Sequence, residues 1–345
     1  MTLPLSAEAL EAAARERMTD ASYAFFAYGC GAEQSLEENV TAWRRWLVRP
    51  RVLRGTDGLS TRTTVLGTPT DIPLLLAPCG MNRLAHPDGE LAVARAAAAA
   101  GVVQVLSTTS STPLDEVAAQ TNAPKWFQLY CDATAQGTDE RIKRAADAGF
   151  KAIAITVDTP FLGLRYKGLG NLAVFANEVA ELQQRTGFDF SGFVETPTLD
   201  WREIERVCAH AELPILLKGI LHPDDARLAV DLGVAGVIVS NHGARQLDGT
   251  VPPALALPDI VEAVADRVEV YVDGGIRSGV DVLRALALGA RAVLIGRPYL
   301  WALAIAGEDG VRELLERFAA EIRNAMALSG QKDATNVDRD IVAAL

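Results

Sequence analysis

One short segment of the chain combines a proton acceptor with an anion-binding side chain. It is residues 240–250, Ser-Asn-His-Gly-Ala-Arg-Gln-Leu-Asp-Gly-Thr, and it follows the apolar run Gly236–Val239. His242 can act as a general base near neutral pH, and Arg245 presents a planar fork that binds a carboxylate bidentately. Gly243 permits a sharp turn between them. This combination is what an enzyme needs to take a proton or a hydride equivalent from a 2-hydroxy acid.

Eight short apolar runs are predicted to be strands, and this segment follows the sixth of them. The runs are Ile72–Ala77, Val102–Ser107, Lys125–Tyr130, Ala152–Val157, Pro214–Lys218, Gly236–Ser240, Val268–Asp273 and Ala292–Gly296. Helical periodicity lies between most of them, at Gly89–Ala100, Asp139–Ala148, Pro223–Leu232, Leu257–Val264 and Gly279–Leu288. This alternation indicates a parallel sheet buried on both faces, and eight units predict a (β/α)8 TIM barrel. An open doubly wound sheet is the alternative, but no dinucleotide-binding glycine fingerprint follows the first strand.

Two stretches fall outside this alternation. Residues 1–65 precede the first strand and carry helical patterns over Ala7–Met18 and Leu36–Trp46, so we expect an N-terminal helical cap. Residues 166–200 are the longest connection without a clear strand and follow the fourth strand. Long loops on the carboxyl face of a barrel often cover a binding site, which predicts a lid loop. We expect residues 1–345 to form one domain.

Composition and charge exclude several classes of function. The chain has 345 residues, 49% hydrophobic content and a net charge of −11, which disfavours nucleic acid and anionic membranes as partners. An anionic ligand must therefore be held by a local cationic site. The sequence contains no apolar run long enough for a membrane span and no secretory signal. The four cysteines match no zinc or disulfide spacing, so we expect no metal, reduced thiols and a cytoplasmic location.

Polar side chains stand at the ends of the third to eighth predicted strands. They are Gln128, Tyr130, Thr156, Asp158, Lys218, His242, Asp273 and Arg297, with Arg165 and Arg277 in the loops that follow. Active sites of barrels are built at this face. Glycines at 274, 275 and 296 beside Arg277 and Arg297 indicate a phosphate site after the last two strands. Lys218 could stabilise negative charge on a reduced cofactor.

Three motifs in this set carry a resemblance to a known family. They are Ser240–Asp248, the run Asp273-Gly-Gly-Ile-Arg277 and the run Ile295-Gly-Arg-Pro298. The chain resembles the FMN-dependent 2-hydroxy acid oxidases and dehydrogenases, which include glycolate, lactate and mandelate oxidases, from about Tyr23 to Ser329. The resemblance implies FMN as cofactor and oxidation of an (S)-2-hydroxy acid to a 2-keto acid. Electrons would pass to O2, giving H2O2, or to another acceptor, and family members often form homotetramers.

The resemblance also implies a role for each matching residue. His242 would be the catalytic base, Asp158 would stabilise its protonated form, and Tyr130 would hydrogen-bond the substrate. Arg245 and Arg165 would bind the substrate carboxylate beside Phe25. The residues implied to hold FMN are Pro78, Cys79, Gly80, Ser107, Gln128, Thr156, Lys218, Ser240, Asp273, Gly275, Arg277, Gly296 and Arg297.

Three departures from the family pattern bear on the substrate and the electron acceptor. Phe25 replaces a tyrosine, and Thr109 replaces a bulky tryptophan of short-acid oxidases, so both favour a bulky or aromatic, mandelate-like substrate. Gly80 stands where oxidases have alanine, which leaves open a dehydrogenase or monooxygenase that makes little peroxide. A different FMN reaction on a phosphorylated anion and a flavin-binding module without turnover are further alternatives. His242 with Arg245 argues for a carboxylate substrate, and the set of His242, Arg245 and Asp158 argues against the module without turnover.

Overall fold

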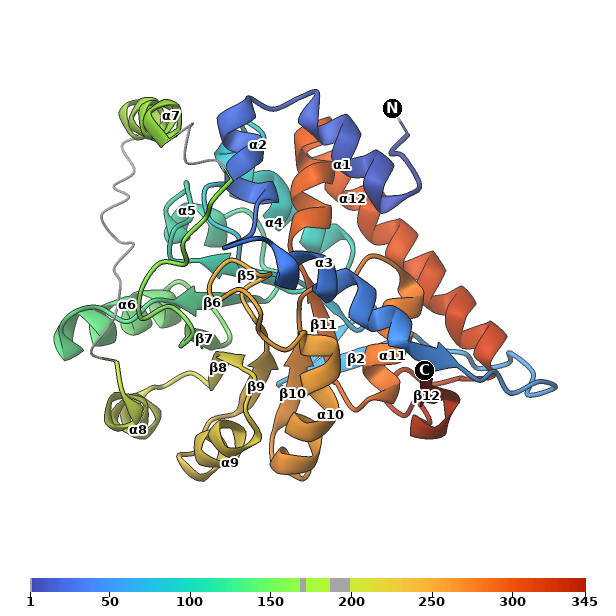
Figure 1. The fold of residues 1–345 in the computed structure, drawn as a ribbon. Helices are drawn as coiled ribbons and strands as arrows, with labels where there is room; N and C mark the ends of the chain where they lie inside the picture. The colour runs from blue at the N-terminus through green and yellow to red at the C-terminus, as the bar shows by residue number, and fades with distance from the viewer. Residues whose placement is uncertain (1, 168–171, 187–198) are drawn as a thin grey trace.

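The computed structural model describes residues 2–167, 172–186 and 199–345, and eight parallel strands in them close into a barrel (Figure 1). The strands are β4 (Leu74–Leu76), β5 (Gln104–Ser107), β6 (Lys125–Leu129), β7 (Ile153–Thr156), β8 (Ile215–Ile220), β9 (Gly236–Val239), β10 (Glu269–Val272) and β11 (Ala292–Ile295). Each pairs with its neighbour in chain order, and β11 pairs with β4 to close the ring. The predicted (β/α)8 barrel is therefore confirmed, with all eight strands inside or within two residues of the predicted runs.

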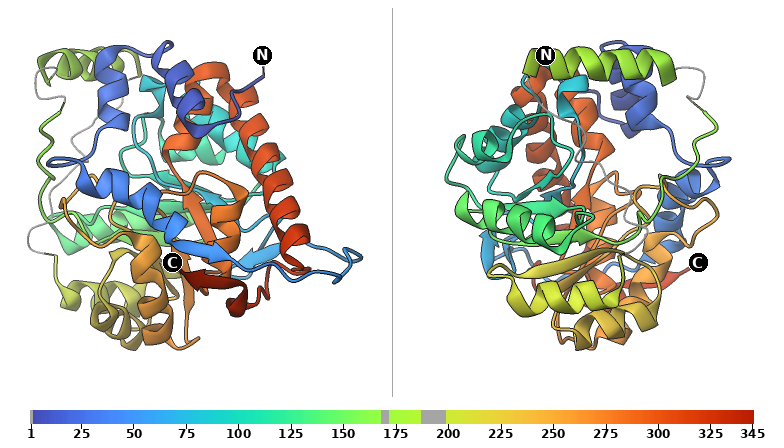
Figure 2. Two further views of the ribbon diagram at one scale, coloured as in Figure 1. Left: turned by 45° about the vertical axis from the view of Figure 1, so that its right-hand side comes forward. Right: turned by 90° about the vertical axis from the view of Figure 1, so that its left-hand side faces the viewer.

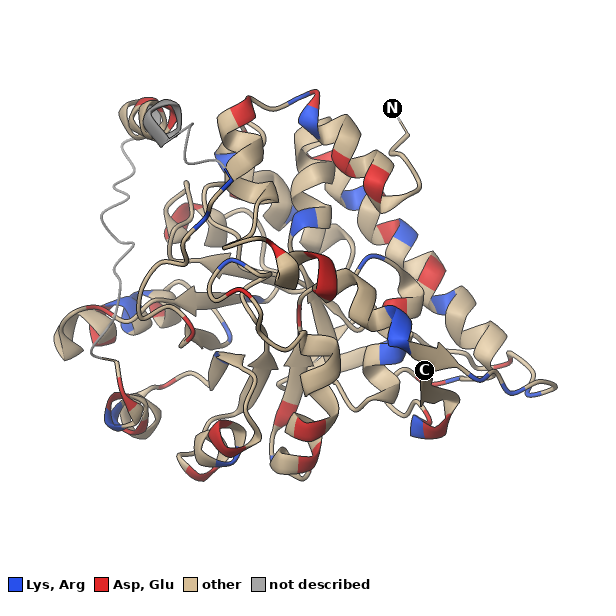
Figure 3. Ribbon diagram, viewed as in Figure 1, with Lys and Arg blue, Asp and Glu red and all other residues tan. Residues whose placement is uncertain are grey.

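Helices surround the barrel in both further views (Figure 2). They are α4 (Gly89–Ala99), α5 (Leu114–Ala118), α6 (Ala135–Asp147), α8 (Trp201–His210), α9 (Pro223–Asp231), α10 (Pro253–Val264), α11 (Gly279–Ala287) and α12 (Arg297–Ser329), which is interrupted at Ala306 and Gly307. Their outer faces carry charge, as the acidic residues of α9 and α10 show (Figure 3). None of the helices in the described residues is both long and apolar enough to cross a membrane.

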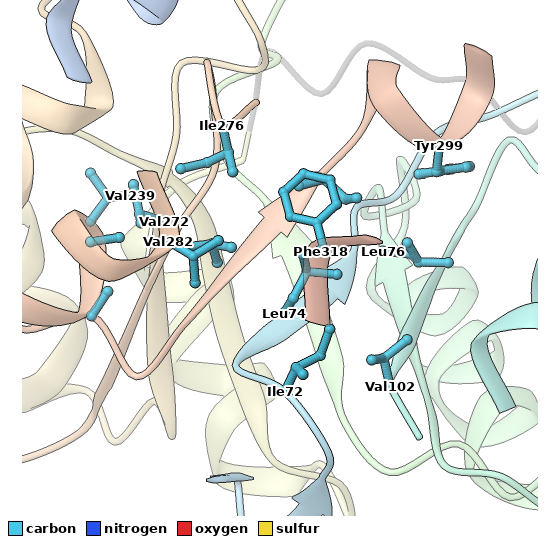
Figure 4. Close-up of a cluster of buried hydrophobic side chains, with 14 of the residues drawn as sticks. Ile72, Leu74, Leu76, Val102, Val239, Val272, Ile276, Val282, Tyr299 and Phe318 are labelled. Atoms are coloured by element: carbon cyan, nitrogen blue, oxygen red, sulfur yellow. The ribbon is translucent and has the colours of Figure 1, made fainter. Parts of the chain in front are cut away.

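The core has two layers because side chains alternate along each strand. Leu75 points into the barrel, where it joins Trp126 and Tyr271 in a fully buried interior cluster. Leu74 and Leu76, its neighbours in the chain, belong instead to the layer between the strands and the helices (Figure 4). A continuous apolar run thus serves both layers, which is why these strands show no polar alternation.

The N-terminal segment divides between the two ends of the barrel. Its helices are α1 (Ala7–Arg15), α2 (Asp20–Ala27) and α3 (Gln34–Thr41), followed by the 3-10 helix η1 (Ala42–Arg45). Its strand β1 (Trp46–Val48) pairs with β12 (Val342–Ala344), which follows the 3-10 helix η5 (Arg339–Ile341), and β2 (Thr63–Val65) pairs with β3 (Thr68–Thr70). Val65 enters the barrel interior, and the Leu66 amide donates to Glu269 at the start of β10, 2.8 Å away. The hairpin therefore closes the amino end of the barrel.

Three expectations for the segments outside the barrel need correction. The pattern over Ala7–Met18 is helical only to Arg15, and Leu36–Trp46 is not one helix, because Trp46 begins a strand. Helix α2 was not predicted. The predicted lid loop, residues 166–200, contains helix α7 (Leu172–Thr186), which packs beside α2 (Figure 2), where Ser22 donates to Glu178 at 2.8 Å. Residues 168–171 and 187–198 of that segment lie outside the described residues.

Glycines that follow three outer helices adopt left-handed backbone conformations. Gly149, Gly233 and Gly289 have φ of 86°, 87° and 101° and lead into the next strand. Glycine adopts this conformation without strain, so it ends a helix readily. The contacts differ, because a Cβ at Gly289 would lie 2.7 Å from Val261 whereas one at Gly149 would meet nothing within 4 Å.

This contrast predicts unequal costs for one substitution. Gly149→Ala should lower the free energy of unfolding by about 1 kcal/mol through backbone strain alone. Gly289→Ala should cost more, because its methyl group also collides with Val261. Denaturant unfolding of the two variants measures the difference. An equal or smaller loss for Gly289→Ala would contradict this account of the packing.

Candidate active site

A histidine and a carboxylate meet at the carboxyl end of the barrel. His242 follows β9 and Asp158 follows β7, strands that both pair with β8. His242 Nδ1 lies 2.9 Å from Asp158 Oδ1, and His242 Nε2 lies 3.5 Å from the Tyr130 hydroxyl. An ionised carboxylate only accepts hydrogen bonds, so Nδ1 must carry the proton of the neutral ring. Nε2 is then left as the proton acceptor.

His242 is held in an unusual backbone conformation. His242, Gly243 and Ala244 have consecutive positive φ values of 60°, 61° and 64°, which non-glycine residues rarely adopt. The turn is fixed at both ends, since the Ala244 amide donates to Asn241 and the His242 amide donates to Ser240 Oγ at 3.0 Å. Strained backbone of this kind is kept where surrounding contacts over-determine it, and it directs the imidazole towards Asp158.

The charges around this pair keep each group in a defined protonation state. Burial by itself raises the pKa of Asp158, but His242 and Lys218 outweigh it and hold the pKa below its usual value. Burial also lowers the pKa of Lys218, and the charges of Asp273 and Asp158 reverse that effect and raise it. Asp158 is therefore ionised and Lys218 is protonated at neutral pH. Ser240, which is fully buried, accepts from Lys218 Nζ at 3.0 Å and so connects the lysine to the His242 turn.

Two arginines are arranged around Phe25 of helix α2. Arg245 Nη1 donates to the Phe25 carbonyl at 2.6 Å, and Arg165 Nη1 donates to the same oxygen at 3.3 Å. The guanidinium carbons lie 5.1 and 5.6 Å from the centre of the Phe25 ring, within cation–π range. Burial lowers the pKa of Arg245 well below its usual value, and repulsion from Arg165 and Arg297 adds to this. A bound carboxylate would offset that repulsion.

The role of Phe25 is thus wider than the sequence indicated. The family pattern presented it as a lost hydrogen bond to the substrate, whereas the structure gives its carbonyl and its ring a part in holding both arginines. No sequence signal reveals this, because a backbone carbonyl is available at every position.

One cavity of about 550 Å³ gathers most of the predicted site, within the usual size of ligand pockets. The predicted residues that line it are Phe25, Pro78, Cys79, Gly80, Ser107, Gln128, Tyr130, Thr156, Arg165, Lys218, His242, Arg245, Asp273, Gly275, Arg277, Gly296 and Arg297. Ser240 and Asp158 are not among the lining residues and instead contact lining residues from behind. These two therefore position the groups that face the cavity.

The predicted phosphate site has unpaired polar atoms. Arg297 donates to the carbonyls of Phe26 and Gly243, each at 2.9 Å, but its Nη2 is buried without a hydrogen-bond partner among the described residues. Asp273 Oδ1 is in the same state. Burial, with repulsion from Arg277, lowers the pKa of Arg297 to about 10. A buried polar atom without a hydrogen-bond partner costs free energy. A ligand such as FMN could satisfy both atoms, because its phosphate can accept from Arg297 and its hydroxyls can donate to Asp273.

The packing of helix α3 gives Gly275 a second reason to be glycine. We expected its lack of a side chain to let an anion approach the backbone. A Cβ there would lie 1.8 Å from the Asn39 carbonyl, so the glycine is required by the close approach of helix α3. Gly275 still lines the cavity, beside Gly274.

Helix α3 and the 3-10 helix η1 that follows it contribute Asn39 and Trp43, which the sequence patterns did not single out for function. Asn39 and Asn241 are both buried and exchange reciprocal amide hydrogen bonds of 2.8 and 2.7 Å. The Trp43 indole donates to the Gly274 carbonyl at 2.9 Å. Asn39 and Trp43 are four residues apart, a spacing that puts both on one helical face. That spacing could have indicated their common burial, but not the partner some 200 positions away.

A closed parallel barrel with a histidine–carboxylate pair, two adjacent arginines and a cationic cavity of about 550 Å³ is the arrangement expected of a flavin-dependent oxidoreductase. The model of the FMN-dependent dehydrogenase family matches residues 14–344, and the chain belongs to that family, with FMN as its cofactor.

The chain is 47% identical over 334 residues to a 4-hydroxymandelate oxidase of Amycolatopsis orientalis, covering 93% of each chain. It is 41% identical to a peroxisomal (S)-2-hydroxy-acid oxidase of Oryza sativa subsp. japonica, covering 99% of this chain and 96% of the relative. A crystal structure of mandelate oxidase with benzoyl-formic acid superposes with a TM-score of 0.88 at 44% identity, covering 99% and 98%.

The protonation state of Tyr130 leads to a prediction about pH. Burial raises the pKa of Tyr130, and the charge of Asp158 adds to this, so the hydroxyl stays protonated through about pH 10, where an unperturbed tyrosine ionises. Tyr130→Phe should therefore lower kcat/KM by the same factor at every pH from about 7 to 10. Tyr166→Phe, at an exposed position, serves as the control. Convergence of the Tyr130→Phe and unaltered profiles at alkaline pH would contradict the prediction.

Proposed function

We propose that the chain oxidises an (S)-2-hydroxy acid with a bulky or aromatic, mandelate-like side chain to the 2-keto acid, with O2 as final acceptor and H2O2 as product. The observation that carries the proposal is the meeting of a base and an anion clamp in one cavity. His242 provides the unprotonated imidazole nitrogen Nε2, and Arg245 and Arg165 provide the cations. The names of the relatives, which include mandelate oxidases, support the substrate class.

The side chains divide the work of the reaction. The substrate loses the hydroxyl proton, the hydrogen on its α-carbon and, with them, two electrons. His242 Nε2 takes a proton, and Asp158 stabilises the imidazolium that forms. Arg245 and Arg165 hold the carboxylate, and the Tyr130 hydroxyl donates to the substrate. Bound FMN would accept the electron pair together with the second hydrogen.

The remaining predicted residues would hold FMN. Lys218, protonated beside Asp273, would stabilise the negative charge that reduction adds to the ring. Arg277 and Arg297 would bind the phosphate with Gly275 and Gly296. The ring would lie against Pro78, Cys79, Gly80, Ser107, Gln128 and Thr156, with Ser240 supporting it from behind.

The packing around position 80 explains why the residue there is glycine, and this explanation does not involve the electron acceptor. A Cβ there would lie 2.0 Å from Thr109 Oγ1 and 2.9 Å from the Thr109 carbonyl. Glycine at this position therefore suits the contact with Thr109, and it is weak support for the dehydrogenase or monooxygenase alternative. Thr109 lines the cavity with the apolar side chains of Met81 and Leu162, which suits a substrate ring.

Two further proposals concern the oligomeric state and the cellular location. We propose a homotetramer from the family resemblance. We propose a cytoplasmic location from the four cysteines, none of which is paired in the structure. Size-exclusion chromatography with light scattering and cell fractionation test them.

An anaerobic half-reaction tests the proposed function. The FMN-loaded protein should lose its flavin absorbance with (S)-mandelate faster than with lactate or glycolate, and O2 should then restore the absorbance and yield H2O2. His242→Asn should bind FMN but bleach roughly 10²–10⁴-fold more slowly, since it lacks the base. Unchanged flavin with every 2-hydroxy acid would refute the proposal. Bleaching without reoxidation by O2 would refute its oxidase part.

The clamp predicts the effect of one conservative change. Arg245→Lys keeps the charge but loses the planar fork, so KM should rise and kcat should fall for a carboxylate substrate. Loss of one charged hydrogen bond costs about 1.5–3 kcal/mol, which should lower kcat/KM by roughly 10–160-fold. Arg144→Lys, in an exposed ion pair, is the control. Unchanged kinetics in Arg245→Lys would remove Arg245 from the clamp.

A further inference from the structure

A buried carboxylate lies behind one wall of the cavity. Glu90, in the first turn of α4, is only 1% exposed. Its Oε1 accepts from the amide of Asn82 at 3.0 Å and from the amide of Ser111 at 2.8 Å. The Ser111 hydroxyl donates to both carboxylate oxygens, at 2.9 and 2.7 Å, and the Thr112 hydroxyl donates to Oε2 at 3.0 Å.

All the donors to Glu90 in this set are neutral. A buried carboxylate without a cationic partner is costly unless its lone pairs are satisfied, and here hydroxyls and amides satisfy them. An apolar residue would fill the same space without that cost. Glu90 therefore does more than fill space in the core. The hydrogen-bond donors that surround its carboxylate indicate what that further role is.

The donors come from two separate loops that both line the cavity. Asn82 belongs to the loop after β4, residues 77–84, which includes the 3-10 helix η2 (Asn82–Leu84). Ser111 and Thr112 belong to the loop after β5, residues 108–112. The cavity is lined by Pro78, Cys79, Gly80 and Met81 of the first loop and by Thr109 of the second. Glu90 is thus bonded to both loops at once.

The two loops are also in direct contact at the cavity wall. The Met81 amide donates to the Thr109 carbonyl at 2.9 Å, and Met81 has a positive φ of 56°. Thr109 Oγ1 occupies the space beside Gly80 where a methyl group would lie. The Arg83 amide donates to Ser111 Oγ at 3.1 Å, on the side nearer Glu90. A shift of either loop would therefore move Met81 and Thr109 together.

We propose that Glu90 is a positioning residue that sets the width of the substrate pocket. Its carboxylate fixes the 77–84 and 108–112 loops against each other, so that Met81 and Thr109 leave room for a bulky substrate side chain. The identity of that substrate rests on the proposed function. The ordering of the two loops by Glu90 is independent of the proposed function.

The test compares Glu90→Gln with the unaltered FMN-loaded protein. Glutamine has nearly the same shape, but its amide nitrogen only donates, so the Ser111 and Thr112 hydroxyls can no longer donate to that position and must reverse their hydrogen bonds. The ratio of kcat/KM for (S)-mandelate to that for (S)-lactate should fall about tenfold, which corresponds to 1.4 kcal/mol of selectivity. Amide hydrogen exchange in residues 77–84 and 108–112 should become faster. Val207→Ala, a core truncation in α8, should lower stability and leave both readouts unchanged.

A double-mutant cycle separates positioning from general destabilisation. Ser111→Ala removes the hydroxyl that bridges both carboxylate oxygens, and its effect on the selectivity ratio should not add to that of Glu90→Gln, because both break one contact. If Glu90→Gln does not fold, Thr112→Val carries the test, since it removes one donor and preserves shape.

A selectivity ratio within twofold of the unaltered value would overturn the proposed control of pocket width, as would an equal change in Val207→Ala. Unchanged exchange in both loops would overturn the positioning role itself. If no 2-hydroxy acid reduces the flavin in the unaltered protein, the proposed function fails instead. The exchange experiment then still decides whether Glu90 orders the loops.

Discussion

Excess positive charge at the carboxyl end of the barrel is the constraint on which the rest of the site depends. Among the described residues, six cations line the cavity, Lys167, Lys218, Arg165, Arg245, Arg277 and Arg297, whereas one carboxylate, Asp273, lines it and a second, Asp158, lies behind His242. The whole chain carries a net charge of −11, so this concentration is local. It is stable only if other groups supply negative potential, and anionic ligands do so when they bind.

The N-terminal cap supplies part of that potential before any ligand binds. Backbone carbonyls of Phe25 and Phe26 accept from Arg165, Arg245 and Arg297. Asn39 fixes the amide of Asn241 next to His242, and Trp43 binds the backbone of the neighbouring Gly274. The cap is therefore part of the active site. Helix α3 also restricts position 275 to glycine, so cap and barrel have to fit each other closely.

Elements that depend on local periodicity were predicted well. A strand buried on both faces needs a short apolar run, and a helix end needs a glycine such as Gly289, so both leave marks in neighbouring residues. Helix α7 left no comparable mark, and α2 is short, with apolar residues on several sides. Neither Asn39 nor Glu90 could be assigned a partner from the sequence, because each acts through residues that are distant in the chain or through backbone amides.

The sequence by itself determined the barrel and most of the polar residues that face the cavity, and its resemblance to a known family indicated the cofactor. Parallel strands bring their carboxyl ends to one rim, so polar residues at strand ends must gather there whatever the details of packing. Only the tertiary structure decided how those residues are held: the left-handed turn at His242, the double role of Phe25, the approach of Asn39 to Gly275, and the two loops that meet at Glu90. These depend on contacts between segments that the chain order does not place together, and on backbone groups that every residue carries.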